Sequence, residues 1–220
     1  VRRAAVAIRD GRVAWVGPEA ELPDSFRDEL EELDCEGRAA LPGFVDAHTH
    51  LPFVGDRADE FARRLRGETY QEVLRSGGGI LATVRATRKA SVDDLVAAMR
   101  PRADRMLAFG TTTAEAKSGY GLDIETERRQ LEAIAALDRT HPLELVPTYL
   151  GAHALPIEYR EDRWGYVDLV AGRGLAAVRD HAQFVDVFCD QGAFTVDEAR
   201  AVLRAGGRAG LGLRVHANEL

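Results

Sequence analysis

Short apolar runs alternate with longer amphipathic stretches along most of the chain. Segments with helical spacing of apolar residues lie at 61–65, 70–74, 81–90, 91–110, 125–137 and 195–205. Five apolar runs between and around these segments read as strands, at 41–47, 111–117, 143–150, 184–189 and 211–215. Repeated strand–loop–helix units favour right-handed crossovers, so the pattern predicts an α/β fold with a parallel sheet of about five βα units.

The first 40 residues follow a different pattern. Two short runs typical of strands, 5–8 and 12–17, are separated by a segment that contains Asp10-Gly11. Asp-Gly between two such runs is typical of a tight hairpin. We therefore expect a small β-rich appendage over residues 1–40, as part of a β-sandwich-like domain, and a barrel-forming domain over residues 41–220.

Ionisable and aromatic residues recur just past the carboxyl ends of the apolar runs. They include four of the six histidines of the chain, and the set is His48, His50, Lys117, Tyr120, His153, Asp190, His216 and Glu219. In a barrel of parallel strands these ends meet on one face, which holds the active site. Loops are often polar by chance, but chance does not account for so large a share of the histidines.

Composition and charge narrow the class of protein. The chain has 220 residues, of which 45% are hydrophobic and 30% charged, as in ordinary globular proteins. Its net charge of −7 argues against a general nucleic-acid binder. No apolar run approaches the roughly 18–20 residues of a membrane span. Two cysteines, Cys35 and Cys189, cannot form a disulfide framework, so we expect a reducing, cytoplasmic setting.

The histidines provide candidate metal ligands. His48 and His50 are separated by one residue directly after an apolar run, so in extended backbone both side chains project to the same face. His216 follows the last apolar run and could supply a third imidazole. Three protein ligands leave a position open for water on a catalytic zinc or iron ion, which can then supply hydroxide for hydrolysis of a carbon–nitrogen bond. Two exposed loop histidines and one core histidine are the alternative interpretation.

The segment Leu41-Pro42-Gly43-Phe44-Val45-Asp46-Ala47-His48-Thr49-His50 resembles the first-strand signature of the amidohydrolase superfamily, whose metal hydrolases are built on a TIM barrel. Seven further segments narrow the resemblance to the imidazolonepropionase family, namely 55–57, 77–80, 83–88, 116–122, 148–153, 185–189 and 216–219. This resemblance implies hydrolysis of the cyclic amide of 4-imidazolone-5-propanoate to N-formimidoyl-L-glutamate, in histidine degradation. It also implies a (β/α)8 barrel, incomplete here, and one zinc or iron ion, and it leaves a homodimer open.

The resemblance also assigns roles to individual residues. It implies that the metal ligands are His48, His50 and His216. It matches Arg57 to an arginine that holds the propanoate, and a guanidinium does pair bidentately with a carboxylate. The residues that match further substrate contacts are Tyr70, Tyr120 and His153. Glu219 matches an acidic residue near the ring and the nucleophilic water, and we expect it to orient either of them more than to abstract a proton.

Several of these residues also have structural explanations. Without the resemblance, Arg57 would read as a solvated arginine and Tyr70 as a half-buried helix residue, whereas Tyr120 lies between two glycines and is hard to explain as core. Lys117 is expected to pair with Glu115 or Asp190 rather than to bridge two metals as a carboxylated lysine. Residues 77–79 are expected to be a hinge between helices, and Cys189 a strand residue rather than a nucleophile.

Two groups of the family pattern do not occur in this chain. They are a histidine on the sixth strand and an aspartate on the eighth, because the five predicted βα units fall short of the eight in a complete barrel. We therefore expect this chain to be the N-terminal part of a longer enzyme, whose activity on its own is left open. Two alternatives remain at this point: another cyclic amidohydrolase or deaminase, which would not need the cationic clamp of Arg57, and a non-catalytic metal-binding half-barrel.

Overall fold

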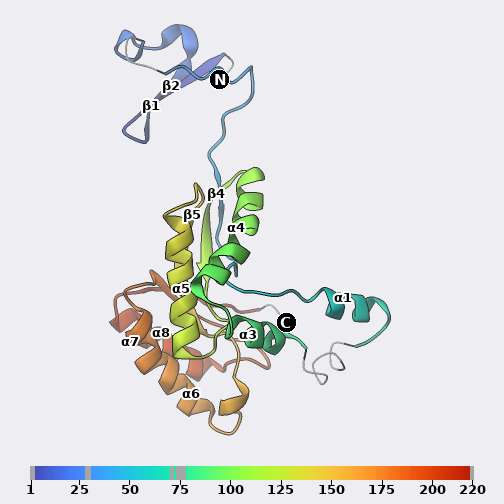
Figure 1. Ribbon diagram of the computed structural model, residues 1–220. Coiled ribbons are helices and arrows are strands. Elements are labelled where there is room, and N and C mark those ends of the chain that lie inside the picture. Colours follow the sequence, from blue (N-terminus) through green and yellow to red (C-terminus); the bar gives the residue numbers. More distant parts are fainter. Residues whose placement is uncertain (1–2, 28–30, 70–71, 73–77, 219–220) are drawn as a thin grey trace. The chain divides into compact units, whose positions relative to one another are not determined.

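The chain folds into two compact units, Val1–Pro42 and Gly43–Leu220 (Figure 1). The computed structural model describes residues 3–27, 31–69, 72 and 78–218. None of the helices in these ranges combines the length and the apolar composition that a membrane span requires.

The first unit contains an antiparallel pair of strands, β1 (Ala4–Arg9) and β2 (Arg12–Pro18). Asp10 and Gly11 join them with φ angles of 53° and 71°. Two successive residues with positive φ are what a type I′ turn requires, and Asp-Gly tolerates this backbone best. The hairpin predicted from the sequence is thus confirmed. Two short 3-10 helices follow, η1 (Glu19–Glu21) and η2 (Asp24–Phe26).

The second unit is built on a five-stranded sheet in the order β3-β4-β5-β6-β7, in which every neighbouring pair is parallel. The strands are β3 (Phe44–Asp46), β4 (Thr111–Lys117), β5 (Glu144–Ala152), β6 (Phe184–Val187) and β7 (Gly212–Leu213). Strands that follow one another along the chain are also neighbours in the sheet, as in a βα barrel. This arrangement confirms the predicted α/β class and the five parallel strands.

Helices connect successive strands of this sheet (Figure 1). They are α1 (Ala58–Leu65), α3 (Ile80–Thr87), α4 (Val92–Ala108), α5 (Ile124–Asp138), α6 (Arg163–Leu169), α7 (Leu175–Val178) and α8 (Val196–Arg208), with the 3-10 helix η3 (Ile157–Tyr159) before α6. The core includes Leu95 and Met99 of α4 together with Leu131 and Ile134 of α5, all of them fully buried. Helix α8 approaches β6 so closely that a methyl group at Gly206 would overlap the side chain of Val185.

Capping boxes begin two of these helices. Ser91 and Asp94 form the box of α4, and Thr195 and Glu198 form that of α8. In the second box the Thr195 side chain accepts from the Glu198 backbone N–H at 3.3 Å, in the usual spacing.

The structure differs from the sequence pattern at several elements. The two edge strands are shorter than predicted, since each has a partner on one side only, and β6 ends at Val187, so Cys189 lies just beyond the strand. Helices α6 and α7 were not predicted. A π-helical turn at Val170–Gly174 joins them and shifts the apolar spacing that marks an α-helix. The predicted helix at 70–74 and the glycine at 77 lie largely outside the described residues.

Candidate metal centre and substrate site

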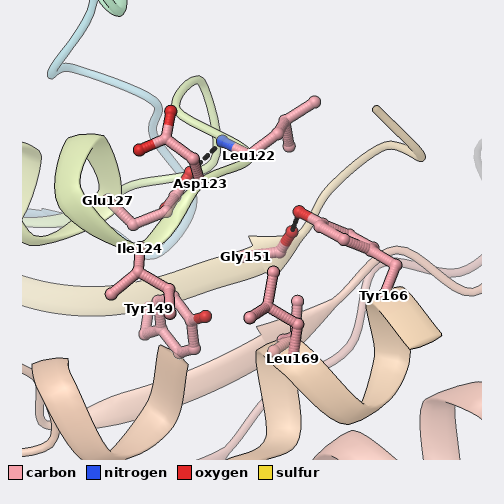
Figure 2. Close-up of a pocket in the computed structure, with 9 residues that line it drawn as sticks. Leu122, Asp123, Ile124, Glu127, Tyr149, Gly151, Tyr166 and Leu169 are labelled. Atoms are coloured by element: carbon pink, nitrogen blue, oxygen red, sulfur yellow. Dashed lines mark hydrogen bonds between the residues drawn. The ribbon is translucent and has the colours of Figure 1, made fainter. Parts of the chain in front are cut away.

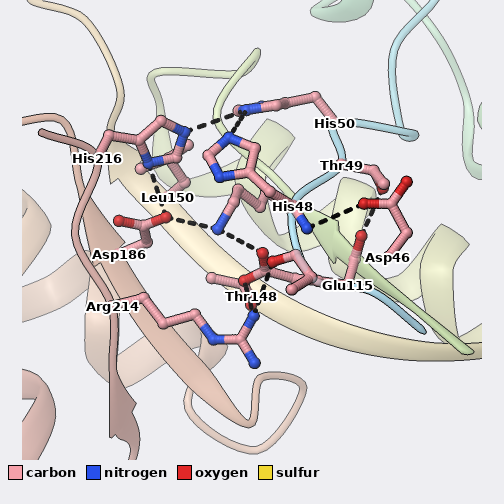
Figure 3. Close-up of polar contacts among 12 residues, drawn as sticks. Asp46, His48, Thr49, His50, Glu115, Thr148, Leu150, Asp186, Arg214 and His216 are labelled. Carbon is pink, nitrogen blue, oxygen red and sulfur yellow. Dashed lines mark hydrogen bonds and ion pairs between the residues drawn. The ribbon is translucent and has the colours of Figure 1, made fainter. Parts of the chain in front are cut away.

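Three histidine side chains converge beyond the carboxyl ends of the strands (Figure 3). His48 and His50 follow β3, and His216 follows β7. The Nε2 atom of His50 lies 3.4 Å from Nε2 of His48 and 3.2 Å from Nε2 of His216. One ligand atom from each of the three residues lies within 4.8 Å of the other two. The structure thus brings together the three residues that the sequence singled out as metal ligands.

The donor set fits a single metal ion better than it fits hydrogen bonding. An Nε2 atom carries either one proton or one lone pair, so Nε2 of His50 can form a hydrogen bond with only one of its two neighbours. Two imidazole nitrogens bound to one zinc ion, each at about 2.0–2.1 Å and at a tetrahedral angle, would lie about 3.3 Å apart. The observed separations are close to this value.

The protonation state of the cluster also suits a metal. The pKa of His50 is lowered to about 2, mainly by burial and in smaller part by repulsion from the neighbouring His153, His216 and His48. Burial is also the main cause that lowers the pKa of His48, followed by His216. Both imidazoles are therefore neutral at pH 7, which is the form that offers a lone pair to a cation.

Hydrogen bonds to the backbone hold the segment that follows β3. The backbone N–H of Lys117 donates to the Thr49 carbonyl at 3.0 Å, and Nε2 of Gln130 donates to the Pro52 carbonyl at 2.5 Å. Nη1 of Arg102 donates to the carbonyls of Leu51 and Phe53, at 2.8 Å each. Strand β4 and helices α4 and α5 therefore fix the path of the chain around the two histidines.

Backbone hydrogen bonds with β6 and with the residue just beyond it position His216. Its N–H donates to the Val187 carbonyl at 3.0 Å, and its carbonyl accepts from the N–H of Cys189 at 2.9 Å. On the side-chain side, its Nδ1 lies 2.8 Å from Oδ2 of Asp186, which also lies 2.6 Å from Nζ of Lys117. Burial alone would raise the pKa of Asp186, but the contacts with His216 and Lys117 outweigh it and lower this pKa, so the carboxyl is ionised.

Lys117 lies between two buried carboxylates. Its Nζ is 2.6 Å from Oε2 of Glu115 as well as 2.6 Å from Asp186. Glu115 in turn accepts a hydrogen bond from Thr148 Oγ1 at 2.6 Å and pairs with Nη1 of Arg214 at 2.6 Å (Figure 3). The predicted pair with Glu115 is found, whereas the second partner is Asp186 and not Asp190. With both carboxylates on its Nζ, Lys117 is not a bridging metal ligand.

Tyr120 and His153 lie beside the histidine cluster. The rings of His153 and His50 stack with their centroids 4.9 Å apart, and Tyr120 is edge-on to both, at 5.2 Å from His153 and 5.8 Å from His50. Nδ1 of His153 donates to the Gly119 carbonyl at 2.8 Å, which leaves a lone pair on Nε2. Burial lowers the pKa of His153 to about 4 and raises the pKa of Tyr120. Both groups are therefore neutral hydrogen-bonding groups near pH 7.

A buried carboxylate shapes the loop that carries Tyr120. Glu127 accepts from the backbone N–H groups of Gly119, Gly121 and Leu122 at 2.8, 2.9 and 2.8 Å. Figure 2 shows its bond with Leu122, next to the buried Tyr149. Leu122 has a φ of 55°, a conformation that costs energy in a residue with a side chain. Three hydrogen bonds to one side chain hold this loop against that cost.

The remaining predicted site residues are Arg57, Tyr70 and Glu219. Arg57 is exposed at the N-cap of α1, and within the described ranges no acidic group forms an ion pair with it. Its positive charge nevertheless affects Tyr120. Burial raises the pKa of the Tyr120 phenol, and the charge of Arg57 lowers this pKa in part. Tyr70 and Glu219 lie outside the residues that the structure describes.

Several residues of the site were not singled out from the sequence. Arg102 stacks on Phe53, with its guanidinium carbon 3.7 Å from the ring centroid, and Phe53 contacts Tyr120. An arginine on an amphipathic helix gives no signal of such a role. Asp186 did carry a signal, as Glu115 did for its pair with Lys117, because charged residues inside strands of a buried parallel sheet need partners.

Comparisons with known proteins show that the chain is similar to imidazolonepropionases. The sequence model of a family described as "Imidazolonepropionase-like composite domain, bacteria" matches residues 4–28. The imidazolonepropionase of Symbiobacterium thermophilum is 51% identical over 221 residues, which cover 98% of this chain and 52% of the relative. That of Haloarcula marismortui is 50% identical over 220 residues, with coverage of 98% and 52%. The predicted resemblance is confirmed, and the chain spans about half the length of these curated relatives.

Solved structures support the fold. A 5-methylcytosine deaminase from Klebsiella pneumoniae, liganded with 5-fluorocytosine, superposes with a TM-score of 0.63. The match covers 98% of this chain and 48% of that one, at 16% sequence identity. At this identity the likeness concerns the fold alone, and together with the five parallel strands it confirms the predicted TIM-type half-barrel.

Proposed function

We propose that this chain, a relative of the imidazolonepropionases along 98% of its length, carries the metal-binding part of a hydrolase that opens the cyclic amide of 4-imidazolone-5-propanoate. One observation carries the proposal. Three imidazoles, from the neighbouring positions 48 and 50 and from the distant position 216, converge beyond the ends of the strands, and the rings of His153 and Tyr120 lie against that of His50.

In this proposal, His48, His50 and His216 hold one zinc or iron ion. When bound, such an ion polarises a carbonyl group and lowers the pKa of water towards neutrality. His153 and Tyr120 bind the ring through hydrogen bonds, since both are neutral near pH 7 and lie against His50. Contact with the ring of Phe53 keeps the phenol of Tyr120 in place.

Arg57 is proposed to bind the propanoate. The support is its match to the family arginine, its exposure at the N-cap of α1 and its electrostatic effect on Tyr120. A guanidinium at this place would orient an acid tail while the ring lies against Tyr120 and His153. By sequence match alone, Tyr70 is proposed as a further substrate contact and Glu219 as the group that orients the water or the ring.

The proposed setting is the cytoplasm, and the proposed partner is the small-molecule substrate. Cys35 and Cys189 are both free thiols, in keeping with a reducing compartment. The net charge of −7 does not favour nucleic acid as a partner. The homodimer stays a prediction.

The test combines metal analysis with a turnover assay. Both are run on this chain and on a version extended to the length of its relatives, after loading with zinc or with iron. The proposal expects one bound ion per chain and loss of 4-imidazolone-5-propanoate with the extended version. Turnover of a purine or hydantoin-like ring instead would support another cyclic amidohydrolase, and bound metal without any turnover would support a non-catalytic half-barrel.

A further inference from the structure

The three candidate metal ligands are held in unequal ways. Nδ1 of His216 lies 2.8 Å from Oδ2 of Asp186. Nδ1 of His50 and Nδ1 of His216 are both buried and neither forms a hydrogen bond of regular geometry, but only Nδ1 of His216 lies within ion-pair distance of a carboxylate, and His48 is exposed. Within the described part of the chain, only His216 therefore has a carboxylate behind its ring.

Asp186 is itself fixed from several sides. Its Oδ1 accepts from the N–H of Val187 at 2.7 Å, and its Oδ2 lies 2.6 Å from Nζ of Lys117 and 2.8 Å from His216. Asp186 and Lys117 are each 1% exposed. A carboxylate with donors on both oxygens and no access to water cannot rotate to find other partners. Its position relative to His216 is therefore set by β4 and β6, the strands that carry Lys117 and Asp186.

The structure assigns Asp186, held by Lys117, as a positioning group for the metal ligand His216. Its carboxylate accepts the proton-bearing Nδ1 of the imidazole, so that the lone pair stays on Nε2 and the ring faces His48 and His50. The inference rests on the proposed function only in so far as it takes the three histidines to be ligands of one ion. Partners of this kind are known to set the tautomer of metal-bound histidines and to raise their basicity.

A purely structural role for these charges makes a different prediction. Buried ion pairs contribute little net stability compared with apolar residues of similar volume, because both ions lose their hydration. If the cluster served only to fill the barrel interior, a carboxylate-to-amide change would have similar effects at Asp186 and at Glu115. Glu115 contacts the same lysine at the same 2.6 Å but does not contact His216. It is therefore the matched control.

The first experiment compares Asp186→Asn with Glu115→Gln. The affinity of each purified variant for Zn²⁺ is measured by competition with a chromophoric chelator. We expect Asp186→Asn to weaken zinc binding by about 10- to 100-fold, and Glu115→Gln to change it by less than about threefold. Equal losses in the two variants, or no loss in Asp186→Asn, would overturn the assignment.

The second experiment uses the wild-type chain, so it tests the assignment even if a variant does not fold. Nitrogen-15 chemical shifts of His216 in the metal-free wild-type chain report which ring nitrogen carries the proton. The assignment requires the proton on Nδ1, and a proton on Nε2 would overturn it even if the zinc affinities behave as expected. An extended version that binds zinc but does not hydrolyse 4-imidazolone-5-propanoate would refute the proposed function and leave the assignment standing.

Discussion

His50 and His216 follow the first and the last strand of the five-stranded sheet, yet their Nε2 atoms lie 3.2 Å apart. In a flat sheet, with about 4.8 Å between neighbouring strands, the outer two strands would be roughly 19 Å apart. The sheet must therefore curl as a barrel wall does, which brings its two edges towards each other. The candidate metal site thus depends on the curvature of the whole sheet and not on one local motif.

Loss of one imidazole should remove the metal. We expect His216→Ala to lower the zinc affinity by at least about 100-fold, because only two of the three protein ligands remain. The measurement is metal content after dialysis, together with the chelator competition. His181→Ala is the control, since His181 is not part of the cluster. Full zinc occupancy in His216→Ala would contradict the site.

Arg57 should govern the affinity for the acid tail. We expect Arg57→Ala to weaken binding of a propanoate-bearing imidazole by about 10- to 100-fold, as for the loss of a charged hydrogen bond, with little change for imidazole itself. Isothermal titration calorimetry of both compounds measures the difference. Arg64→Ala, at an exposed position on α1, should bind both as the wild type does. An equal loss for the two compounds would rule out a carboxylate clamp.

Glu127 should control the order of the loop that carries Tyr120. In Glu127→Gln, one amide oxygen and one NH2 group replace two oxygens that accept three backbone N–H groups, so at least one donor loses its partner. We expect the free energy of unfolding to fall by about 1–3 kcal/mol and the amides of Gly119 and Gly121 to exchange faster with solvent.

The matched control for this loop is Glu125→Gln on the first turn of the same helix. Glu125 is exposed and pairs with Arg128 at the surface, so its replacement should change the unfolding free energy by less than about 0.5 kcal/mol. Urea unfolding and amide exchange measure both variants. Unchanged exchange at Gly119 in Glu127→Gln would show that the carboxylate does not hold the loop.

Glu198 should make stability depend on acid pH. Burial alone would raise its pKa, but the hydrogen bonds from Arg163 and Thr195 outweigh it and lower this pKa below the ordinary 4.5. A lowered carboxyl pKa stabilises the fold above the unfolded-state pKa, and this contribution is lost as the pH falls through the folded-state value. The contribution should thus be complete above about pH 5 and should fade in more acidic solution.

Urea unfolding of Glu198→Gln tests this dependence. We expect the variant to be less stable than the wild type by about 1–3 kcal/mol at pH 7, with the difference shrinking as the pH falls below 4.5. Asp197→Asn is the control, because the Asp197 side chain is 79% exposed in the same turn. A difference between wild type and Glu198→Gln that is the same at pH 7 and pH 3.5 would refute the role of the ionised carboxyl.

The sequence was sufficient to predict features that depend on local pattern. Apolar runs marked the parallel strands, Asp10-Gly11 marked the hairpin, and the histidines after two of the runs marked the place where the cluster forms. Each of these signals depends on a few neighbouring residues. A backbone period or a turn preference is enough to explain them.

Features that depend on contacts between distant residues were not predictable in the same way. Asp186 lies 69 positions from Lys117, and no sequence period indicates that their side chains meet. The helix at 163–169 was not predicted from the sequence, because the π-helical turn that follows it disturbs the spacing of the apolar residues. Arg102 reads as an ordinary helix arginine, and only its contacts with the Leu51 and Phe53 carbonyls reveal its role.

The buried cluster behind His216 contains two carboxylates, Glu115 and Asp186, and two cations, Lys117 and Arg214. Because these charges cancel within the cluster, their electrostatic balance does not require a metal ion nearby. The side chains of His48, His50 and His216 should consequently keep their positions when the ion dissociates. The metal would then bind and dissociate without a change in backbone conformation. Metal-free and metal-loaded protein would differ chiefly in whether an ion occupies the space between the three imidazole rings.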